Sequence, residues 1–401
     1  MTQAPSGNAA MKNKILSIVS YSLKTVVLLC ASGSLMQTFL SVMGFDPGLI
    51  YVHSSFLQAA NVLTMLIASG YAKGAKSIKR AAISAIPLGI LFLFYLPMAI
   101  MRSASTEAYI ALVLVGIGQQ IFLGLWNICD YKMPYYIYRA EEYGRILSIC
   151  GIVGAVLTML TSSFVFTLTL KYDYIVIMAV SFGICALLML IVALLTAMIK
   201  NLYPDMEDEQ TGTKGERISL VRLFSNPIFY KLIHANLLRG FSTGIVIVLA
   251  TVALDLGFDE TLTTSMVPIE SAATLISCAL FGAIATRIQP KYAVIAGSAV
   301  LCVLPLLLVN SRPVFLAVYA VVIFGKMLID NSVPAMLIRV VPVEIAGPYH
   351  AWRIALQNAG TLIATSVAAF TPIPVMLVLG AAFQLIAGVS FFLIDRSARV
   401  K

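Results

Sequence analysis

The chain has 401 residues, of which 60% are hydrophobic and only 11% are charged, against about 25% charged residues in an ordinary soluble domain. Its mean hydropathy is +0.94 and its formal net charge is +9. This composition excludes a soluble enzyme or a soluble binding domain and indicates an integral membrane protein. A positive charge in such a protein is tested first as a signal of topology, and only then as a nucleic-acid patch.

Apolar stretches of the length that crosses a bilayer, roughly 20 residues each, occur twelve times along the chain. In chain order they cover residues 15–42, 49–72, 81–101, 108–129, 146–170, 174–199, 232–254, 262–286, 292–311, 313–338, 354–371 and 374–394. The sequence therefore predicts an all-α polytopic membrane protein with twelve transmembrane helices.

The basic residues are distributed unevenly between the loops of this topology. With the N-terminus inside, 21 of the 27 Lys and Arg residues fall in segments expected to be cytoplasmic, where membrane proteins concentrate them. The remaining six lie outside or within spans: Arg102, Lys171 and Arg312, and Lys24, Arg239 and Lys326. We therefore expect an inner (cytoplasmic) membrane protein with both termini in the cytoplasm and with no nucleic-acid partner.

Two short patterns occur twice. "DYKMPYYIYR" from Asp130 and "DNSVPAMLIR" from Asp330 share Asp, three residues, Pro, four residues and Arg, and "GFD" follows an odd-numbered span at Gly44 and again at Gly257. We expect each Pro to break its helix after the Asp, and each Arg to lie at the cytoplasmic surface. The repetition predicts two six-helix halves in parallel. The expected domains are an N-terminal bundle, a cytoplasmic linker and a C-terminal bundle, at residues 1–199, 200–227 and 228–401.

Charged residues are missing from spans 3, 6, 9 and 12, which also lack amides apart from Gln384 and Asn310 at the end of span 9, so these spans are expected to face lipid. Around this plan, "GAIATRIQPK" (282–291) resembles the loop signature of the major facilitator superfamily through Gly282, Ala285, Arg287 and Lys291. The resemblance implies two parallel repeats around a substrate site near the middle of the membrane.

"DYKMPYYIYRAEEYGR" (130–145) is similar to the region between helices 4 and 5 of the glycoside–pentoside–hexuronide cation symporters. Those proteins use an acid in helix 2 for sodium, and span 2 of this chain has none. The expected coupling ion is therefore a proton rather than sodium, and no cofactor is expected.

Helical spacing places Trp126 and Asp130 on one face of span 4, and it places Lys326 and Asp330 at the matching positions of span 10. The two aspartates are candidates for a cytoplasmic gate with bases such as Arg145 and Arg353, or for structural latches in every state. Lys326 and Asp330 lie four residues apart, so they can neutralise each other, although a partner on another helix is also open.

Arg239 and Glu270 lie within spans 7 and 8. A guanidinium keeps its proton and needs an anion, which the protein or a substrate can supply. A carboxyl can take up and release a proton, which would couple transport to protons. The alternative is a static ion pair between Arg239 and Glu270.

Amides complete the expected cavity lining. They can bind a hydroxyl-rich solute, or they can bond to one another and hold helices together. The candidates for substrate binding are Gln37, Gln58, Asn61, Gln357 and Asn358.

"GFSTG" (240–244) fits the pattern around the nucleophile of serine hydrolases, but that motif needs a turn between a strand and a helix. Here it lies within a span, where Gly240 and Gly244 would instead let two helices approach closely. The three histidines fall at span ends on both sides of the membrane, so the sequence indicates neither an enzyme nor a metal site.

The sequence thus predicts secondary active transport of a small polar solute by alternating access. A sugar or glycoside is the favoured substrate, while an organic anion, an exported drug and a membrane sensor without transport activity stay open. The anion alternative rests on Lys24, Arg239 and Lys326. The expected partners are a small-molecule substrate and the lipid bilayer, and a monomer is expected because nothing requires a partner subunit.

Overall fold

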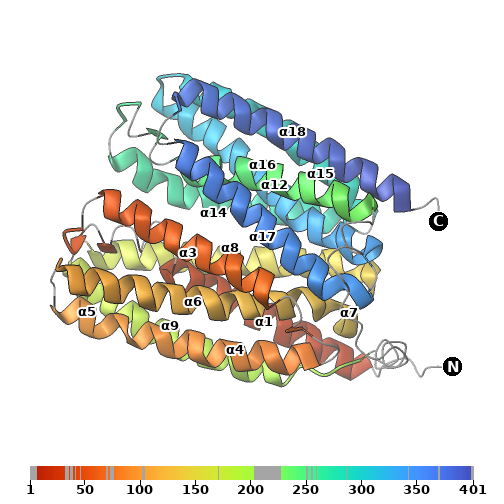
Figure 1. Cartoon of the computed structure of the whole chain (residues 1–401), viewed down its shortest axis with the longest axis horizontal. Coiled ribbons are helices and arrows are strands. Elements are labelled where there is room, and N and C mark those ends of the chain that lie inside the picture. The colour runs from red at the N-terminus through yellow and green to blue at the C-terminus, as the bar shows by residue number, and fades with distance from the viewer. Residues whose placement is uncertain are drawn as a thin grey trace. The chain divides into compact units, whose positions relative to one another are not determined.

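The described part of the chain, in the computed structural model, consists mainly of helices (Figure 1). The structure describes residues 7–31, 36, 39–40, 42–45, 47–68, 71–72, 76–101, 104–169, 171–202, 227–249, 252–253, 256–258, 260–285, 287–341, 343–368 and 371–398. No β-strand occurs within these ranges, and the predicted all-α class is confirmed.

Each of the first six predicted spans overlaps one described helix or two consecutive ones. Span 3 is interrupted at Phe94, where a turn separates two helices. In chain order the helices are α1 (Gly7–Ala31), α3 (Pro47–Ile67), α4 (Lys76–Leu93), α5 (Tyr95–Met101), α6 (Thr106–Lys132), α7 (Pro134–Ile137), α8 (Ala140–Thr169) and α9 (Tyr174–Ala197).

The last six predicted spans are found in the same way. Span 9 changes from an α-helix to a 3₁₀-helix that contains Pro305, whose missing N–H cannot serve an α-helical bond. The helices are α12 (Pro227–Ile247), α14 (Glu260–Ile284), α15 (Pro290–Val300), η1 (Leu301–Leu308), α16 (Arg312–Val340), α17 (Val343–Ala368) and α18 (Ile373–Ala398).

Length and composition alone qualify many of these helices as membrane spans. Among the described residues, 8 helical segments are long and apolar enough to cross a membrane, and two shorter apolar ones lie at Ser55–Ile67 and Pro268–Ile284. The helices α12 and α17 fall outside both groups and carry polar residues within their length, including Arg239 and Gln357. A helix with a polar face is the kind that lines a cavity in a membrane protein.

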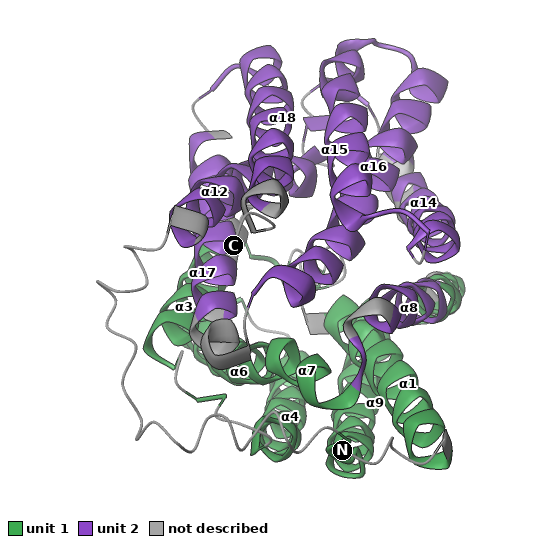
Figure 2. Cartoon of the chain, turned by 90° about the vertical axis from the view of Figure 1, so that its right-hand side faces the viewer, with its two compact units in different colours: residues 1–137, 156–207 green, residues 138–155, 208–401 purple. Residues whose placement is uncertain are grey.

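The chain forms two compact units, coloured separately in Figure 2. Unit 1 comprises residues 1–137 and 156–207, and unit 2 comprises residues 138–155 and 208–401. The first half of α8 therefore belongs to unit 2, where the Ser148 hydroxyl donates to the carbonyl of Cys278 on α14. The domain boundaries predicted at residues 199 and 228 stay a prediction, and most of the linker lies outside the described residues.

The "GFD" repeats have the same backbone in both units. Gly44 and Gly257 take positive φ angles of 95° and 85°, which favour glycine. The amide of the following phenylalanine, Phe45 or Phe258, donates to the carbonyl five residues earlier, at 3.1 Å in both cases. This is the bond that commonly ends a helix at a glycine, so the sequence repeat is also a structural repeat.

The same phenylalanines contact the start of the fourth helix of their own unit. The ring of Phe45 lies 5.6 Å from that of Tyr109 on α6, and the ring of Phe258 lies 5.2 Å from that of Phe315 on α16. Both ring pairs are tilted by 53°. In each unit the first and fourth helices are thus joined at this end by an aromatic pair.

The two Asp–Pro–Arg segments differ where a helix break was predicted. Helix α6 ends at Lys132, and Pro134 begins the short helix α7, as expected. Helix α16 continues through Pro334 to Val340, so the predicted break there is wrong. Membrane helices tolerate proline because neighbouring groups satisfy the freed backbone. The arginines that end the two segments, Arg139 and Arg339, are both exposed.

Candidate functional site

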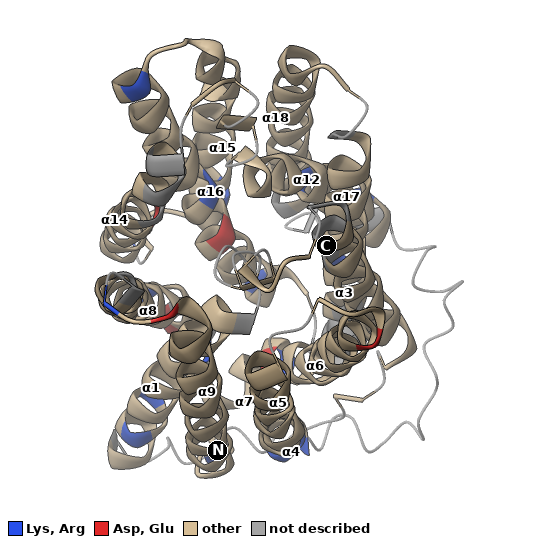
Figure 3. Cartoon of the chain, turned by 90° about the vertical axis from the view of Figure 1, so that its left-hand side faces the viewer, with Lys and Arg blue, Asp and Glu red and all other residues tan. Residues whose placement is uncertain are grey.

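Charged residues are rare along the helices, as Figure 3 shows by colour. Each of the three bases predicted to lie within spans is bonded to an aspartate of a repeated segment. Lys24 bonds to Asp130, and both Arg239 and Lys326 bond to Asp330. The bases and acids therefore form one cluster in each unit.

The cluster of unit 1 is a single pair. The Nζ of Lys24 lies 2.8 Å from Oδ2 of Asp130. It also lies 4.9 Å from the centre of the Trp126 ring and 5.2 Å from that of Tyr21, so two aromatic faces cover the ammonium. Lys24 and Trp126 are both buried. One base and one acid neutralise each other here.

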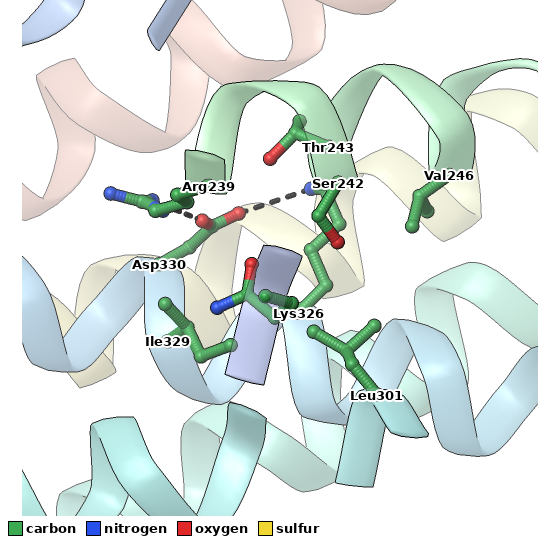
Figure 4. Close-up of a pocket in the computed structure, with 9 residues that line it drawn as sticks. Arg239, Ser242, Thr243, Val246, Leu301, Lys326, Ile329 and Asp330 are labelled. Atoms are coloured by element: carbon green, nitrogen blue, oxygen red, sulfur yellow. Dashed lines mark hydrogen bonds and ion pairs between the residues drawn. The ribbon is translucent and has the colours of Figure 1, made fainter. Parts of the chain in front are cut away.

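The cluster of unit 2 has two bases and one acid. Arg239 on α12 donates through Nη2 to Oδ1 of Asp330, and Lys326 donates through Nζ to Oδ2 of the same carboxylate at 3.0 Å. Figure 4 shows Asp330 with an ion pair on each side, one to each base. With one carboxylate for two cations, the cluster has a formal charge of +1.

This cluster lines a pocket, called here the Arg239 pocket, with about 200 Å³ of empty space including its open mouth. Its lining is Arg239, Ser242, Thr243, Val246, Leu301, Lys326, Ile329, Asp330 and Gln384. Figure 4 shows Arg239, Ser242 and Thr243 on one helix, opposite Lys326 and Asp330. Charges, hydroxyls and an amide give the pocket both donors and acceptors of hydrogen bonds.

Two nitrogens of Arg239 are left over. The residue is 4% exposed, and its Nε and Nη1 are buried without a hydrogen-bond partner among the described residues. The Oγ of Ser242, on the same helix, is buried without a partner in the same sense. Buried donors are normally satisfied by protein, water or ligand, so the pocket offers unused donors to a bound molecule.

The predicted alternative of an Arg239–Glu270 pair is wrong, because Arg239 bonds to Asp330. Glu270 is exposed on α14, and its Oε2 accepts a hydrogen bond from the hydroxyl of Tyr319 at 3.2 Å. The predicted Lys326–Asp330 pair is confirmed. Asp330 serves both bases because its two carboxylate oxygens accept separately.

The partners predicted for the two aspartates in a gate, with the inner side closed, are Arg145 and Arg353. In this structure Asp130 and Asp330 bond to bases of α1, α12 and α16 within their own units. Arg145 is exposed on α8, and Arg353 is buried on α17. A gating role for these residues stays a prediction.

The predicted amides do not line the Arg239 pocket. Asn61 on α3 donates to Oε1 of Gln120 on α6 at 3.1 Å, which holds two helices together. Gln58 is half-buried on the same helix, and Gln357 and Asn358 are half-buried on α17. Gln37 lies outside the described residues.

The sequence analysis missed Gln384 as a site residue. Span 12 was expected to face lipid, yet Gln384 is 2% exposed, lines the Arg239 pocket and donates to the Oγ of Ser298 at 3.0 Å. The signal was present, because a lone amide in an apolar span needs a polar partner within the protein. Ser242 and Thr243 were also missed, since hydroxyls are common in membrane helices.

The glycines of "GFSTG" have the predicted packing role. A Cβ on Gly240 would overlap the carbonyl of Gln357, and one on Gly244 would come within 2.8 Å of the carbonyl of Thr361. The hydroxyl of Thr361 also donates to the carbonyl of Gly240 at 3.0 Å. Helices α12 and α17 are therefore in backbone contact, and Gly240 fixes the helix that carries Arg239.

Metal-ligating side chains are not grouped in the part of the chain that the structure describes, where no cluster of three or more His, Cys, Asp or Glu residues could hold an ion.

Comparison with known proteins adds a family and a fold. Residues 131–365, more than half of the chain, match the model of the Major Facilitator Superfamily. No curated protein matches the sequence. The narrower resemblance of residues 130–145 to the glycoside–pentoside–hexuronide cation symporters stays a prediction.

Solved structures of several transporters resemble the chain over nearly its whole length. A bacterial homologue of the iron transporter ferroportin, in its outward-facing state, has a TM-score of 0.72 at 15% identity and covers 97% of this chain and 99% of its own. The proton:xylose symporter XylE has a TM-score of 0.73 at 11% identity, with 95% of each chain covered. The human organic anion transporter MFSD10 has a TM-score of 0.63 at 14% identity, covering 96% of this chain and 100% of its own. At these identities the similarity shows the fold alone.

Proposed function

We propose that the chain is a secondary active transporter. It belongs to the Major Facilitator Superfamily. It shares the all-α fold of that family, with twelve transmembrane helices in two parallel repeats. It moves a small polar solute across the cytoplasmic membrane by alternating access. In this proposal it acts as a monomer with both termini in the cytoplasm, as the distribution of Lys and Arg predicts.

The observation that carries this proposal is the polar Arg239 pocket within an otherwise apolar bundle. Polar groups in a membrane interior are costly and mark substrate or ion pathways. Lys326 and Asp330 lie near the middle of α16, and Gln384 lies near the middle of α18, so the pocket is placed well inside the helices.

A hydroxyl-bearing solute is the class that this lining favours. Ser242, Thr243 and Gln384 can donate to or accept from hydroxyl groups, and charged side chains make strong hydrogen bonds with them. The name of XylE, a proton:xylose symporter of the same fold, supports a sugar as the substrate. An exported lipophilic drug fits less well, because it would leave these groups unbonded.

An organic anion is the second candidate, and the excess of bases over acids in the pocket favours it. The name of MFSD10, an organic anion transporter of the same fold, points the same way. The two candidates are compatible if the solute carries both hydroxyls and an anionic group.

Glu270 is the proposed site of proton coupling. Its carboxylate is exposed on α14 and bonded to Tyr319, so it is accessible to a proton and connected to the helix that carries Lys326 and Asp330. The Glu270→Gln variant should lose accumulation driven by a pH gradient but keep exchange of solute at equal concentrations. The control is Glu107→Gln, which changes an exposed acid in the first turn of α6. Gradient-driven accumulation that survives in Glu270→Gln rules out this coupling site.

The test of the proposed function is solute flux in liposomes that contain the purified protein. The panel is D-xylose, D-glucose, D-glucuronate, lactate and tetraphenylphosphonium, each radiolabelled. Saturable uptake of a hydroxylated member is the expected result. Saturable flux of tetraphenylphosphonium alone would identify a drug carrier, and binding without flux of any member would identify a sensor; either result contradicts the proposal.

A further inference from the structure

The unbonded donors of Arg239 are built into the bundle. The glycine-mediated contact of α12 with α17 holds the backbone of this helix in place, and Asp330 holds the guanidinium through Nη2. The remaining nitrogens, Nε and Nη1, have no partner among the described residues and are buried. Leaving a charged donor buried and unbonded is costly, which indicates an acceptor that the chain itself does not supply.

The donors of the pocket define that acceptor more closely. Arg239 and Lys326 carry two positive charges, Asp330 in the lining returns one negative charge, and Glu270 on α14 acts on Lys326 as a second negative charge. The unused Nε and Nη1 of Arg239, rather than a net charge, therefore indicate the acceptor. A neutral sugar offers them only hydroxyl oxygens, whereas a carboxylate offers two charged oxygens in one plane.

We infer that the Arg239 pocket binds a carboxylate of the transported solute, and that the solute is a hydroxylated monocarboxylate of the sugar-acid kind. This inference rests on the proposed function and names the substrate class of the same site. A planar guanidinium matches the two oxygens of a carboxylate. Lys326 provides a second charge, and Ser242, Thr243 and Gln384 are available to the hydroxyls of the solute.

Asp330 has a defined part in this arrangement. It accepts one bond from each base, so an ammonium with three donors and a guanidinium with five both keep donors for a second anion. In the absence of solute it holds the two bases close together. When solute binds, its carboxylate and Asp330 share the same two cations.

The test compares solutes that differ only in the carboxylate. D-Glucuronate and D-glucose are one such pair, and lactate and propane-1,2-diol are a smaller one. Dissociation constants come from the thermal unfolding of the purified full-length protein at increasing ligand concentration. The expected result is that at least one acid binds about tenfold or more tightly than its neutral partner, as a charge-assisted contact provides.

Variants test whether Arg239 causes the preference for an acid over its neutral partner. In Arg239→Gln the ratio of the two dissociation constants should fall toward one, while Arg287→Gln, which changes an exposed arginine after α14, should leave it unchanged. Arg239→Lys provides a second reading if Arg239→Gln does not unfold cooperatively. It keeps the charge but loses the planar fork, so the ratio should still fall.

The possible results separate the inference from the proposed function. If the neutral solutes bind as tightly as the acids and flux is saturable, the inference that the pocket binds a carboxylate is wrong, while the proposed transport function is retained. Glucose 6-phosphate binding more tightly than glucuronate would replace the monoanion by a phosphate and also overturn it. Neither binding nor flux of any member would overturn both proposals.

Discussion

The two units each carry an aspartate within their fourth helix, Asp130 in α6 and Asp330 in α16, yet they surround it differently. In unit 1, Asp130 meets one base, Lys24, and the face of Trp126 covers that base. In unit 2, Asp330 meets two bases, and within the described part of the chain no aromatic ring lies over either of them. The first cluster pairs one base with one carboxylate, whereas the second sets two bases against one shared carboxylate and lines a pocket.

Under the proposed function, this difference distinguishes a structural contact from a candidate binding site. A base and an acid with opposite charges of equal size neutralise each other. Lys24 and Asp130 can therefore hold α1 to α6 without a charged ligand. A second base beside one acid leaves charge and donors over, which a ligand can use. The repeat therefore places an ion pair between the first and fourth helices of each unit. In unit 2 the additional base, Lys326, makes this pair a candidate site.

The largest expected effect is a loss of solute uptake when Arg239 is replaced, but not when Lys24 is replaced. Arg239→Gln should reduce uptake of the best solute by about 30-fold or more, since a buried charged contact contributes about 2 kcal/mol or more to binding. It should cost little stability, because Lys326 still pairs with Asp330. Lys24→Gln should instead lower the stability of the protein and leave uptake nearly unchanged. Uptake and thermal unfolding of both variants provide the check, and equal uptake losses would remove the distinction between the units.

Glycine contacts give the next effect, this time on stability. Gly240→Ala should lower the free energy of unfolding by about 3 kcal/mol, since its Cβ would overlap a backbone carbonyl that cannot move aside. In unit 1, Gly124→Ala meets the side chain of Thr64 at 2.9 Å, which can shift, so about 1 kcal/mol is expected.

Gly183→Ala is the matched control for both glycines, because nothing lies within 4 Å of its added Cβ. It should be neutral or slightly stabilising, since alanine favours a helix. The measurement is the thermal unfolding midpoint of the three variants in one detergent. A Gly240→Ala midpoint equal to that of Gly183→Ala would show that α12 and α17 are not in backbone contact.

A double-mutant cycle should sharpen the comparison of the ion pairs. The coupling between Lys24 and Asp130, measured with Lys24→Gln and Asp130→Asn, should be about 1–2 kcal/mol, because Asp130 has a single base as its partner. The coupling between Lys326 and Asp330 should be smaller, since Arg239 keeps Asp330 bonded when Lys326 is replaced. Unfolding of the single and double variants gives both values. A larger coupling in unit 2 would contradict this interpretation.

The smallest effect concerns Gln384. Gln384→Leu should cost about 1 kcal/mol of stability, because it removes one buried hydrogen bond to Ser298. It should also weaken the binding of a hydroxylated solute a few-fold. Leu385→Met, at the exposed neighbouring position, is the control. Unchanged solute affinity in Gln384→Leu would place the amide outside the site.

The helices, the repeat and the bases and acids could be predicted from the sequence, because length, hydropathy and charge are properties of short stretches of the chain. Lys24, Arg239, Asp130 and Asp330 were all found in this way. Their partners were not, since helical spacing tells which residues share a face but not which helix that face meets. Arg239 was therefore weighed against Glu270 instead of Asp330.

Other misses have similar physical causes. Pro334 was expected to end its helix, but tertiary contacts in a bundle can support a helix through a proline. Gln384 was assigned to a lipid-facing span on the apolar character of its neighbours, although its own polarity pointed inward. The composition of a span thus predicts its place in the bundle less well than its one polar residue does.

The most direct test removes the acid that the solute would share. In Asp330→Asn the Arg239 pocket keeps both bases, so D-glucuronate should bind about tenfold more tightly while the affinity for D-glucose stays the same. The measurement is the dissociation constant of each ligand for the wild-type protein and for the variant. An unchanged or weaker affinity for glucuronate would show that Arg239, Lys326 and Asp330 form a structural contact like that of Lys24 and Asp130.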